Sequence, residues 1–136
     1  MGKTHDIVVV GATGYTGRLV VEHLARFGGP ARRFAIAGRD ATKLREIASG
    51  VRASSGYEPP IFVASAEDRR AIAQLASAAD VVLACAGPFG RLGESVVEAC
   101  VEAGTDYVDI TGELDFVRRL VERYHARAEG AGLRCV

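Results

Sequence analysis

Three glycines spaced three residues apart are the residues of this sequence best suited to hold a ligand. Gly11, Gly14 and Gly17 come directly after the apolar run Ile7–Val10, and a helical pattern begins at Arg18. Glycine allows backbone angles closed to other residues, and it leaves no Cβ between the backbone and a bound group. The first N–H groups of a helix lack partners and carry partial positive charge. This stretch therefore predicts a site for a phosphate or diphosphate.

The three glycines are expected to have different tasks. Gly11 takes the unusual backbone angles, Gly14 lets a diphosphate approach, and Gly17 lets the helix at 18–27 pack closely on its strand. Turn glycines with a purely steric role are the alternative. The position of the triplet between a buried strand and a helix favours nucleotide binding. The spacing G-x-x-G-x-x-G also occurs in short-chain dehydrogenases, so the triplet alone does not fix the family.

A second candidate for ligand contact stands at the end of the next apolar run. Phe34–Gly38 reads as a strand, and Arg39 follows it where a dinucleotide-binding domain meets the adenosine ribose. An acid at this position binds the 2′-hydroxyl of NAD, whereas an arginine accommodates the 2′-phosphate of NADP. Arg39, with Lys43 as a further cation, favours NADP(H) over NAD(H); a solvated surface charge is the alternative. Asp40 is interpreted as the N-cap of a helix at 41–49.

A glycine and a proline follow the fourth apolar run. Asp80–Ala86 has no polar break after its first residue, as expected of a parallel strand covered on both faces. In a doubly wound sheet the ends of the first and fourth strands flank the crevice that binds ligands. Ala86, Gly87 and Pro88 are therefore expected beside the nicotinamide ribose, and a turn with nothing bound is the alternative.

These residues need a scaffold in which strands and helices alternate. The pattern predicts further strands at 61–64 and 106–110, helices at 66–78, 92–103 and 114–130, a loop at 51–60, and the start of a sixth strand at 133–136. Such alternation predicts an α/β fold: a doubly wound parallel (Rossmann) sheet in a three-layer αβα arrangement, with strand order 3-2-1-4-5-6 and the last strand truncated. Residues 1–136 are expected to form one NAD(P)-binding domain, with a catalytic or substrate domain beyond residue 136.

Composition excludes several classes of function. Lys+Arg and Asp+Glu both number 17, so the net charge of +0 offers no basic field for nucleic acid or an anionic membrane. No apolar run approaches the roughly 20 residues of a transmembrane helix, and no signal peptide is recognised, so a cytoplasmic protein is expected. The histidines are scattered, and no metal site is expected. Buried thiols in a reducing compartment are expected at Cys85, Cys100 and Cys135.

Four stretches of this sequence together resemble a known family. They are Gly11–Gly17, Phe34–Asp40, Ala86–Phe89 and Gly104–Glu113, and the run D-Y-x-D-x-T-G-E in the last is the most specific. The chain is similar to the NAD(P)-binding domain of saccharopine dehydrogenase-like oxidoreductases, above all to the trans-acting enoyl reductase branch.

The resemblance implies a reductase that uses NADP(H). The most similar branch reduces a carbon–carbon double bond in a polyketide-derived lipid precursor, and other branches form or cleave a secondary amine. The resemblance places the 2′-phosphate on Arg39, the nicotinamide ribose beside residues 86–88, and the diphosphate on Gly11, Thr13, Gly14, Tyr15, Thr16 and Gly17. The family's aspartate near the adenine has no counterpart in Val63–Ala66, which leaves the adenine contacts open.

Two rival functions were weighed against this one. A short-chain dehydrogenase needs a Y-x-x-x-K pair, and no tyrosine here has a lysine four residues on. A non-catalytic NADP-sensing domain remains an alternative. We expect Asp109, Thr111 and Glu113 near the nicotinamide end, on the rim of a substrate site or in contact with a further domain; capping of the helix at 114–130 is the alternative for Thr111 and Glu113.

The expected partner is a small-molecule or lipid-like substrate. The sheet edge near Leu133–Val136 is also a surface through which two copies could pair as a homodimer. Residues 1–136 alone are expected to bind NADP(H) weakly and to reduce nothing.

Overall fold

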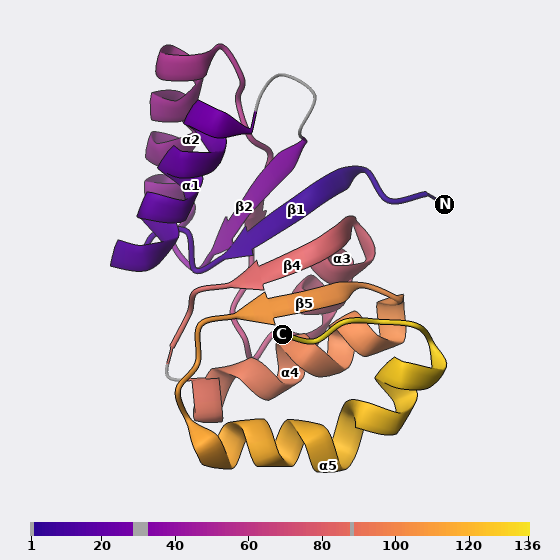
Figure 1. Cartoon of the computed structure of the whole chain (residues 1–136). Helices are drawn as coiled ribbons and strands as arrows, with labels where there is room; N and C mark the ends of the chain where they lie inside the picture. The colour runs from indigo at the N-terminus through magenta and orange to yellow at the C-terminus, as the bar shows by residue number, and fades with distance from the viewer. Residues whose placement is uncertain (1, 29–32, 88) are drawn as a thin grey trace.

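Strands and helices alternate along residues 2–28, 33–87 and 89–136, the part of the chain that the computed structural model describes (Figure 1). The strands are β1 (His5–Val10), β2 (Phe34–Gly38), β3 (Ile61–Val63), β4 (Ala79–Ala84) and β5 (Asp106–Asp109). The helices are α1 (Tyr15–Phe27), α2 (Ala41–Ser55), α3 (Arg69–Ser77), α4 (Phe89–Ala103) and α5 (Leu114–Gly130).

The strands form one parallel sheet in the order β3-β2-β1-β4-β5. This confirms the predicted doubly wound order for the first five strands. The segment predicted as the start of a sixth strand lies beside β5, because Tyr107 pairs with Cys135 in a parallel bridge. The N–H of Val136 also donates to the carbonyl of Tyr107 at 2.9 Å. The chain therefore turns back onto the sheet in the predicted sixth position.

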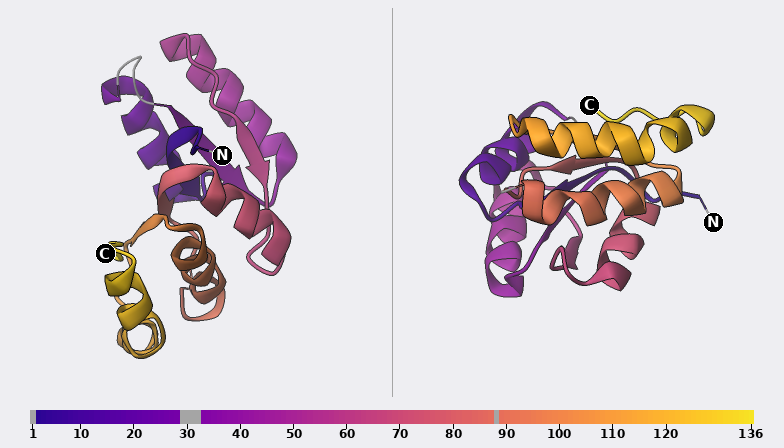
Figure 2. Two further views of the ribbon diagram at one scale, coloured as in Figure 1. Left: turned by 90° about the vertical axis from the view of Figure 1, so that its right-hand side faces the viewer. Right: turned by 90° about the horizontal axis from the view of Figure 1, so that it is seen from below.

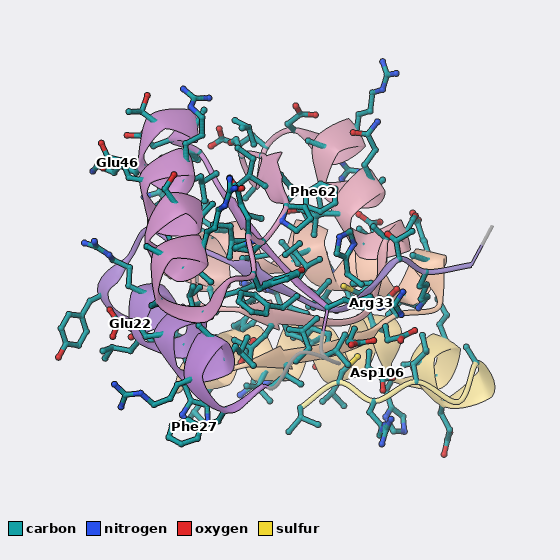
Figure 3. The ribbon with its side chains drawn as sticks, turned by 90° about the horizontal axis from the view of Figure 1, so that it is seen from above. Glu22, Phe27, Arg33, Glu46, Phe62 and Asp106 are labelled. Carbon is teal, nitrogen blue, oxygen red and sulfur yellow. The ribbon has the colours of Figure 1, made fainter. Side chains whose placement is uncertain are left out.

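Helices cover both faces of the sheet, which gives three layers (Figures 1 and 2). In β1, Val8 and Val10 pack into the core under α3, α4 and α5, whereas Val9 packs into the core under α1 and α2. Successive side chains of a strand point to opposite faces, so a strand with helices on both sides must be apolar throughout. Glu22 on α1 and Glu46 on α2 project outward from the outer layer (Figure 3).

Helix α2 is longer than the sequence pattern predicts. It continues through the first part of the expected loop at 51–60 and ends at Gly56, whose φ of 79° requires the left-handed conformation. The hydroxyls of Ser54 and Ser55 donate to the carbonyl of Val51 at 3.2 and 2.7 Å. These serines therefore satisfy the last turn of the helix and do not break it.

The other boundaries shift by a few residues. Helix α1 begins at Tyr15 and α4 at Phe89, both three residues before the predicted starts, whereas α3 begins at Arg69 and not at 66. The later start of α3 follows from Asp68, whose carboxylate accepts the N–H of Ala71 at 3.0 Å and caps the helix. Strand β4 ends two residues earlier than predicted, although the N–H of Cys85 still reaches the carbonyl of Val10 at 2.8 Å.

Helix α5 lies beside α4 (Figure 2). Its sequence carries charged residues along most of its length. Glu94 of α4 contacts Arg119, Arg123 and Tyr124 of α5 and ties the two helices together. Within the described ranges, no helix combines the length and the apolar character that crossing a lipid bilayer requires.

Candidate functional site

A cavity of about 260 Å³ opens at the carboxyl edge of the sheet. It lies where β1, β2, β3 and β4 end, and the first turns of α4 close it on one side. This edge is the place where open parallel sheets bind ligands. Its wall draws on the loops after all four strands and includes Gly11, Thr13, Gly14, Arg39, Ser65, Glu67, Ala86 and Gly87.

The structure brings six of the eleven predicted site residues together on this wall. Tyr15, Thr16, Gly17 and Lys43 are not on it, and the side chain of Tyr15 is 84% exposed. Pro88 lies outside the described residues. The wall thus joins the glycine turn, the end of β2 and the loop after β4, the three regions singled out by the sequence.

Two of the three turn glycines are required by the protein's own packing. Gly11 has φ +81°, and a Cβ there would lie 2.7 Å from the backbone nitrogen of Ala86. A Cβ on Gly17 would overlap the carbonyl of Gly11 and lie 2.7 Å from its carbon, which bears out the predicted close packing of α1 on its strand. A Cβ on Gly14 would meet no protein atom closer than 3.5 Å. Packing therefore does not explain a glycine at position 14.

Helix α1 begins without a cap. Gly14 stands at its N-cap position with no side-chain hydrogen bond, and no acidic residue lies in the first turn. The N–H groups of Tyr15, Thr16 and Gly17 have no hydrogen-bond partner among the described residues. Unpaired N–H groups at a helix start form a positive site for an anion.

Arg39 has its charge available for a ligand. Its side chain is exposed on the cavity wall and makes no hydrogen bond or ion pair with any residue in the described ranges. Asp40 caps α2 by accepting the N–H of Lys43 at 3.1 Å, which confirms the predicted role of that aspartate. The Lys43 side chain is exposed and off the wall, so Arg39 is the cation nearest to the cavity at this end.

Two polar wall residues were missed by the sequence reasoning. Ser65 and Glu67 follow β3, and the N–H of Glu67 donates to the Ser65 hydroxyl at 3.3 Å. The hydroxyl of Ser95 on α4 donates to the carbonyl of Ala66 at 2.9 Å and holds this loop in place. Their position directly after the third strand, at the edge of the sheet where ligands bind, is the sequence signal that points to them.

The loop after β4 is anchored by an acid from another part of the chain. Glu113 accepts the N–H groups of Phe89 and Gly90, at 3.2 and 2.5 Å, and so occupies the start of α4. It makes no side-chain cap on its own helix, α5. Glu113, Asp109 and Thr111 are absent from the cavity wall; Asp109 and Thr111 line a different groove.

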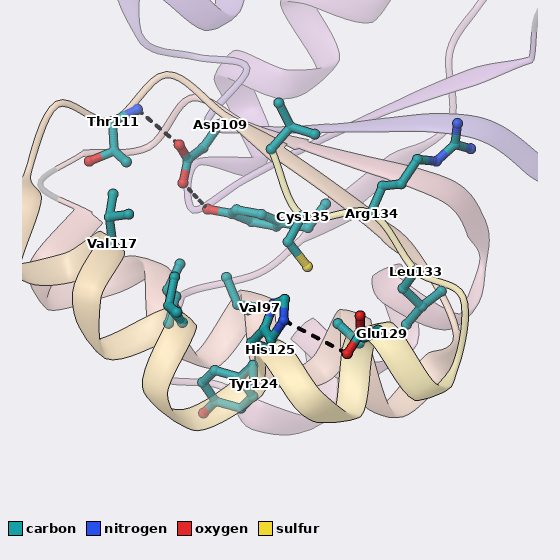
Figure 4. Close-up of a pocket in the computed structure, with 15 residues that line it drawn as sticks. Val97, Asp109, Thr111, Val117, Tyr124, His125, Glu129, Leu133, Arg134 and Cys135 are labelled. Carbon is teal, nitrogen blue, oxygen red and sulfur yellow. Dashed lines mark hydrogen bonds and ion pairs between the residues drawn. The ribbon is translucent and has the colours of Figure 1, made fainter.

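That second groove, of about 450 Å³, lies between α5, β5 and the C-terminal segment (Figure 4). Most of its wall is apolar, with Val97, Val117 and Leu133 among the lining residues. It is the larger of the two hollows. Its lining residues include no glycine, whereas the smaller cavity is lined by Gly11 and Gly14 at the uncapped start of α1.

The cysteines differ in exposure. Cys100 is buried, and burial raises the pKa of its thiol to about 12. Burial also raises the pKa of Cys85, which is half-buried on the cavity wall. Cys135 is exposed, so the expectation of a buried thiol is wrong there. Cys135 lies on the C-terminal segment, which runs along the edge of the sheet beside β5.

Comparison with known proteins agrees with this geometry. The model of the saccharopine dehydrogenase NADP binding domain matches residues 7–136. Trans-acting enoyl reductases of Mycobacterium tuberculosis and Mycobacterium leprae are 43% and 40% identical to this chain over 98% of its length. The chain spans 32% of the length of each of these relatives.

Solved structures share the fold at lower identity. Apo saccharopine dehydrogenase (L-Glu forming) from Saccharomyces cerevisiae superposes with a TM-score of 0.70 at 18% identity, over 96% of this chain and 26% of that one. AtPrR2 with NADP+ and (+)pinoresinol gives a TM-score of 0.62 at 15% identity, over 98% of this chain and 48% of that one. The match to the family model, which covers nearly the whole chain, confirms the resemblance seen in the sequence: this chain belongs to the saccharopine dehydrogenase NADP-binding domain family.

Proposed function

We propose that this chain binds NADP(H) and serves as the cofactor-binding domain of an oxidoreductase that reduces an enoyl group in a lipid or polyketide-derived substrate. The open start of α1, whose N-cap residue Gly14 lines a cavity at the carboxyl edge of the sheet, is the observation that carries the proposal. The family description supports the cofactor, and the relatives at 40–43% identity support the enoyl reductase class.

The proposed site assigns one part of the cofactor to each part of the wall. The diphosphate takes the N–H groups at the start of α1, within the turn Gly11–Gly17. The 2′-phosphate takes Arg39, whose planar guanidinium suits phosphate oxygens. The adenine lies toward Ser65 and Glu67, and the nicotinamide ribose lies along Ala86 and Gly87. This assignment gives every polar wall residue a partner of suitable charge or hydrogen-bonding capacity.

Bound NADPH would supply a hydride. The residues of this chain bind and orient the cofactor through the α1 start and Arg39, and they close one side of the site with α4. No acid or base of the described residues is assigned a role in proton transfer. We propose that the part that holds the substrate lies outside these 136 residues, as it can in relatives of about three times this length.

The preference for NADP(H) can be tested with Arg39→Ala. A hydrogen bond to a charged group contributes about 1.5–3 kcal/mol, and less at an exposed site, so NADPH affinity should fall about tenfold. NADH affinity should change little, because NADH lacks the 2′-phosphate. Isothermal titration of both cofactors measures this difference.

Arg45→Ala is the matched control for that experiment. Arg45 lies on the same helix as Lys43, is exposed, and is absent from the cavity wall. The substitution removes a positive charge, as Arg39→Ala does, but outside the proposed site. The affinities for NADPH and NADH should therefore stay at the parent values. Equal losses for NADPH and NADH in Arg39→Ala would overturn the assignment of the 2′-phosphate.

A further inference from the structure

The run D-Y-x-D-x-T-G-E folds into a chain of hydrogen bonds. The hydroxyl of Tyr107 donates to Asp109 Oδ2 at 2.7 Å, and the N–H of Thr111 donates to Asp109 Oδ1 at 2.9 Å (Figure 4). The N–H of Glu113 then donates to the Thr111 hydroxyl at 3.1 Å. Burial and the neighbouring Asp109 raise the pKa of Tyr107 far above its usual value, so its hydroxyl remains a donor. Each residue of the run thus fixes the next.

This series of hydrogen bonds leads to helix α4 and not to the cofactor cavity. Both oxygens of the Glu113 carboxylate accept N–H groups at the start of α4, one from Phe89 and one from Gly90. A carboxylate at a helix start is stabilised both by charge-assisted hydrogen bonds and by the helix dipole. The run therefore forms a brace between β5 and the first turn of α4.

The first turn of α4 is held from two sides. Arg119 donates to the carbonyl of Gly90 at 3.0 Å, while Glu113 accepts its N–H. A Cβ on Gly90 would lie 2.8 Å from Glu113 Oε2, so only glycine leaves room for this carboxylate without a shift. Phe116 stacks on Phe89 with ring centroids 6.2 Å apart. These contacts leave the start of α4 little freedom to move.

The brace lies immediately beside the proposed nicotinamide end of the cavity. Ala86 and Gly87 form the wall there, and α4 begins two residues after Gly87. Cys85 fixes the β4 end of this short loop through its bond to Val10, and Glu113 fixes the α4 end. Ala86 and Gly87 thus lie between two residues, Cys85 and Phe89, that hydrogen bonds hold in place.

We propose that Glu113 is a positioning residue for the nicotinamide half of the cofactor: its carboxylate holds the first turn of α4, and with it Ala86 and Gly87, in the position that receives this half. The inference rests on the proposed function. Glu113 acts through the loop and touches neither the cofactor nor a substrate. Without its carboxylate the loop occupies its binding conformation for only part of the time, and the apparent affinity falls by that fraction.

The test compares two ligands on the 136-residue chain. NADPH spans the whole cavity, whereas adenosine 2′,5′-bisphosphate carries only the adenosine half and does not reach the loop after β4. Glu113→Gln keeps the size of the side chain but turns one acceptor into a donor. We expect it to weaken NADPH about tenfold and to change the affinity of adenosine 2′,5′-bisphosphate less than about twofold. Isothermal titration measures both.

Asp115→Asn is the matched control. It removes the same charge two residues away, on the exposed first turn of α5, and both affinities should stay at the parent values. If Glu113 contributed only to stability, Glu113→Gln would lower the affinities for NADPH and for adenosine 2′,5′-bisphosphate together. At a temperature well below melting it would lower neither. The ratio of the two affinities therefore separates positioning from stability.

Gly90→Ala tests the same brace without removing the acid. The added methyl group displaces the Glu113 carboxylate, so the variant should also weaken NADPH selectively, and the double variant should lose little more than either single one. Equal losses for the two ligands in both variants, or unchanged NADPH binding, would overturn the inference. A parent chain that binds adenosine 2′,5′-bisphosphate but not NADPH would overturn it as well. A parent chain that binds neither ligand would overturn the proposed function itself.

Discussion

The starts of α1 and α4 lie at the same edge of the sheet, after the neighbouring strands β1 and β4, yet they are completed in opposite ways. The first N–H groups of α1 have no partner in the described part of the chain. Those of α4 hold the carboxylate of Glu113. Both starts attract an anion by the same physics. The protein fills one with its own acid and leaves the other open, and the open one is where we propose that the diphosphate binds.

Two of the three remaining helix starts at this edge support the comparison, whereas α5 has no side-chain cap and carries Asp115 in its first turn. Asp40 occupies the start of α2 and Asp68 the start of α3, each through a hydrogen bond of its carboxylate. A missing cap costs about 1 kcal/mol of stability. Helix α1 gives up this contribution, and the loss is understandable if a diphosphate takes the place of the cap.

The two glycines that flank the start of α1 give the largest expected effects. Gly17→Val places a side chain on the carbonyl of Gly11, and overpacking of this kind costs about 3 kcal/mol or more. A Cβ at position 14 comes no closer than 3.5 Å to any protein atom, so the melting temperature of Gly14→Val should stay near that of the parent. It should still lose NADPH binding about a hundredfold, the equivalent of two charge-assisted hydrogen bonds.

Thermal melting and NADPH titration together check this pair. The expected result is one variant that fails in stability and one that fails in binding alone. Two variants that both melt like the parent would contradict the packing role of Gly17. A Gly14→Val variant that binds normally would remove the ligand from the start of α1.

Sequence patterns predict the residues at the start of α1 but not the contact at the start of α4. The α1 turn and Arg39 were predicted because their signals are local: glycines between a strand and a helix, and a cation directly after a strand. The contact of Glu113 with the start of α4 was not predicted, because Glu113 lies 24 residues after Phe89 in the sequence. Glu113 was expected either near the nicotinamide end or as a cap of the adjacent helix α5, and local spacing gives no sign that it reaches another helix.

The misjudged end of α2 has a similar physical cause. Ser54, Ser55 and Gly56 have the composition of a loop, but the buried Val51 and the serine bonds to its carbonyl extend the helix to Gly56. Tertiary burial overrode a local tendency. The strand order depended on rules of topology, and these agree with the burial of Val8, Val9 and Val10 of the central strand β1 on both faces of the sheet.

Gly14→Asp would turn the open start into a filled one. The φ and ψ of Gly14, −78° and 172°, suit an N-cap residue of any type, so an aspartate can accept an N–H of α1 as Asp40 does on α2. We expect a gain in stability of about 0.5–1 kcal/mol together with loss of NADPH binding through charge repulsion. Chemical denaturation and titration measure the two effects.

Gly14→Ser is the control, because serine caps a helix without a charge. It should gain similar stability and lose less affinity than the aspartate. If Gly14→Asp bound NADPH as well as the parent does, the open start of α1 would not be the anion site, and the contrast with α4 would have no functional meaning.

The smallest effect concerns a carboxylate that accepts a backbone N–H away from any helix start. Asp106 accepts the N–H of Arg134 at 2.9 Å and pairs with its guanidinium at 2.8 Å. These contacts, the backbone bond first, lower the pKa of Asp106 below its ordinary value of 3.8. A lowered pKa in the folded state adds stability above pH 3.8, and this stability disappears as the pH falls through the lowered value.

Asp106→Asn should therefore lower the melting temperature slightly at pH 7, and the difference from the parent should vanish in acid. The cost should stay under about 1 kcal/mol, because the Arg134 side chain is 81% exposed and water screens its charge. No helix dipole adds to this contact, so Glu113→Gln, which leaves two N–H groups of α4 without their acid, should cost more at the same pH. Melting curves of both variants from pH 7 down to pH 3 compare the two carboxylates directly. A larger loss for Asp106→Asn would show that a helix start gives no advantage to the acid that fills it, and the physical basis of the comparison between α1 and α4 would fail.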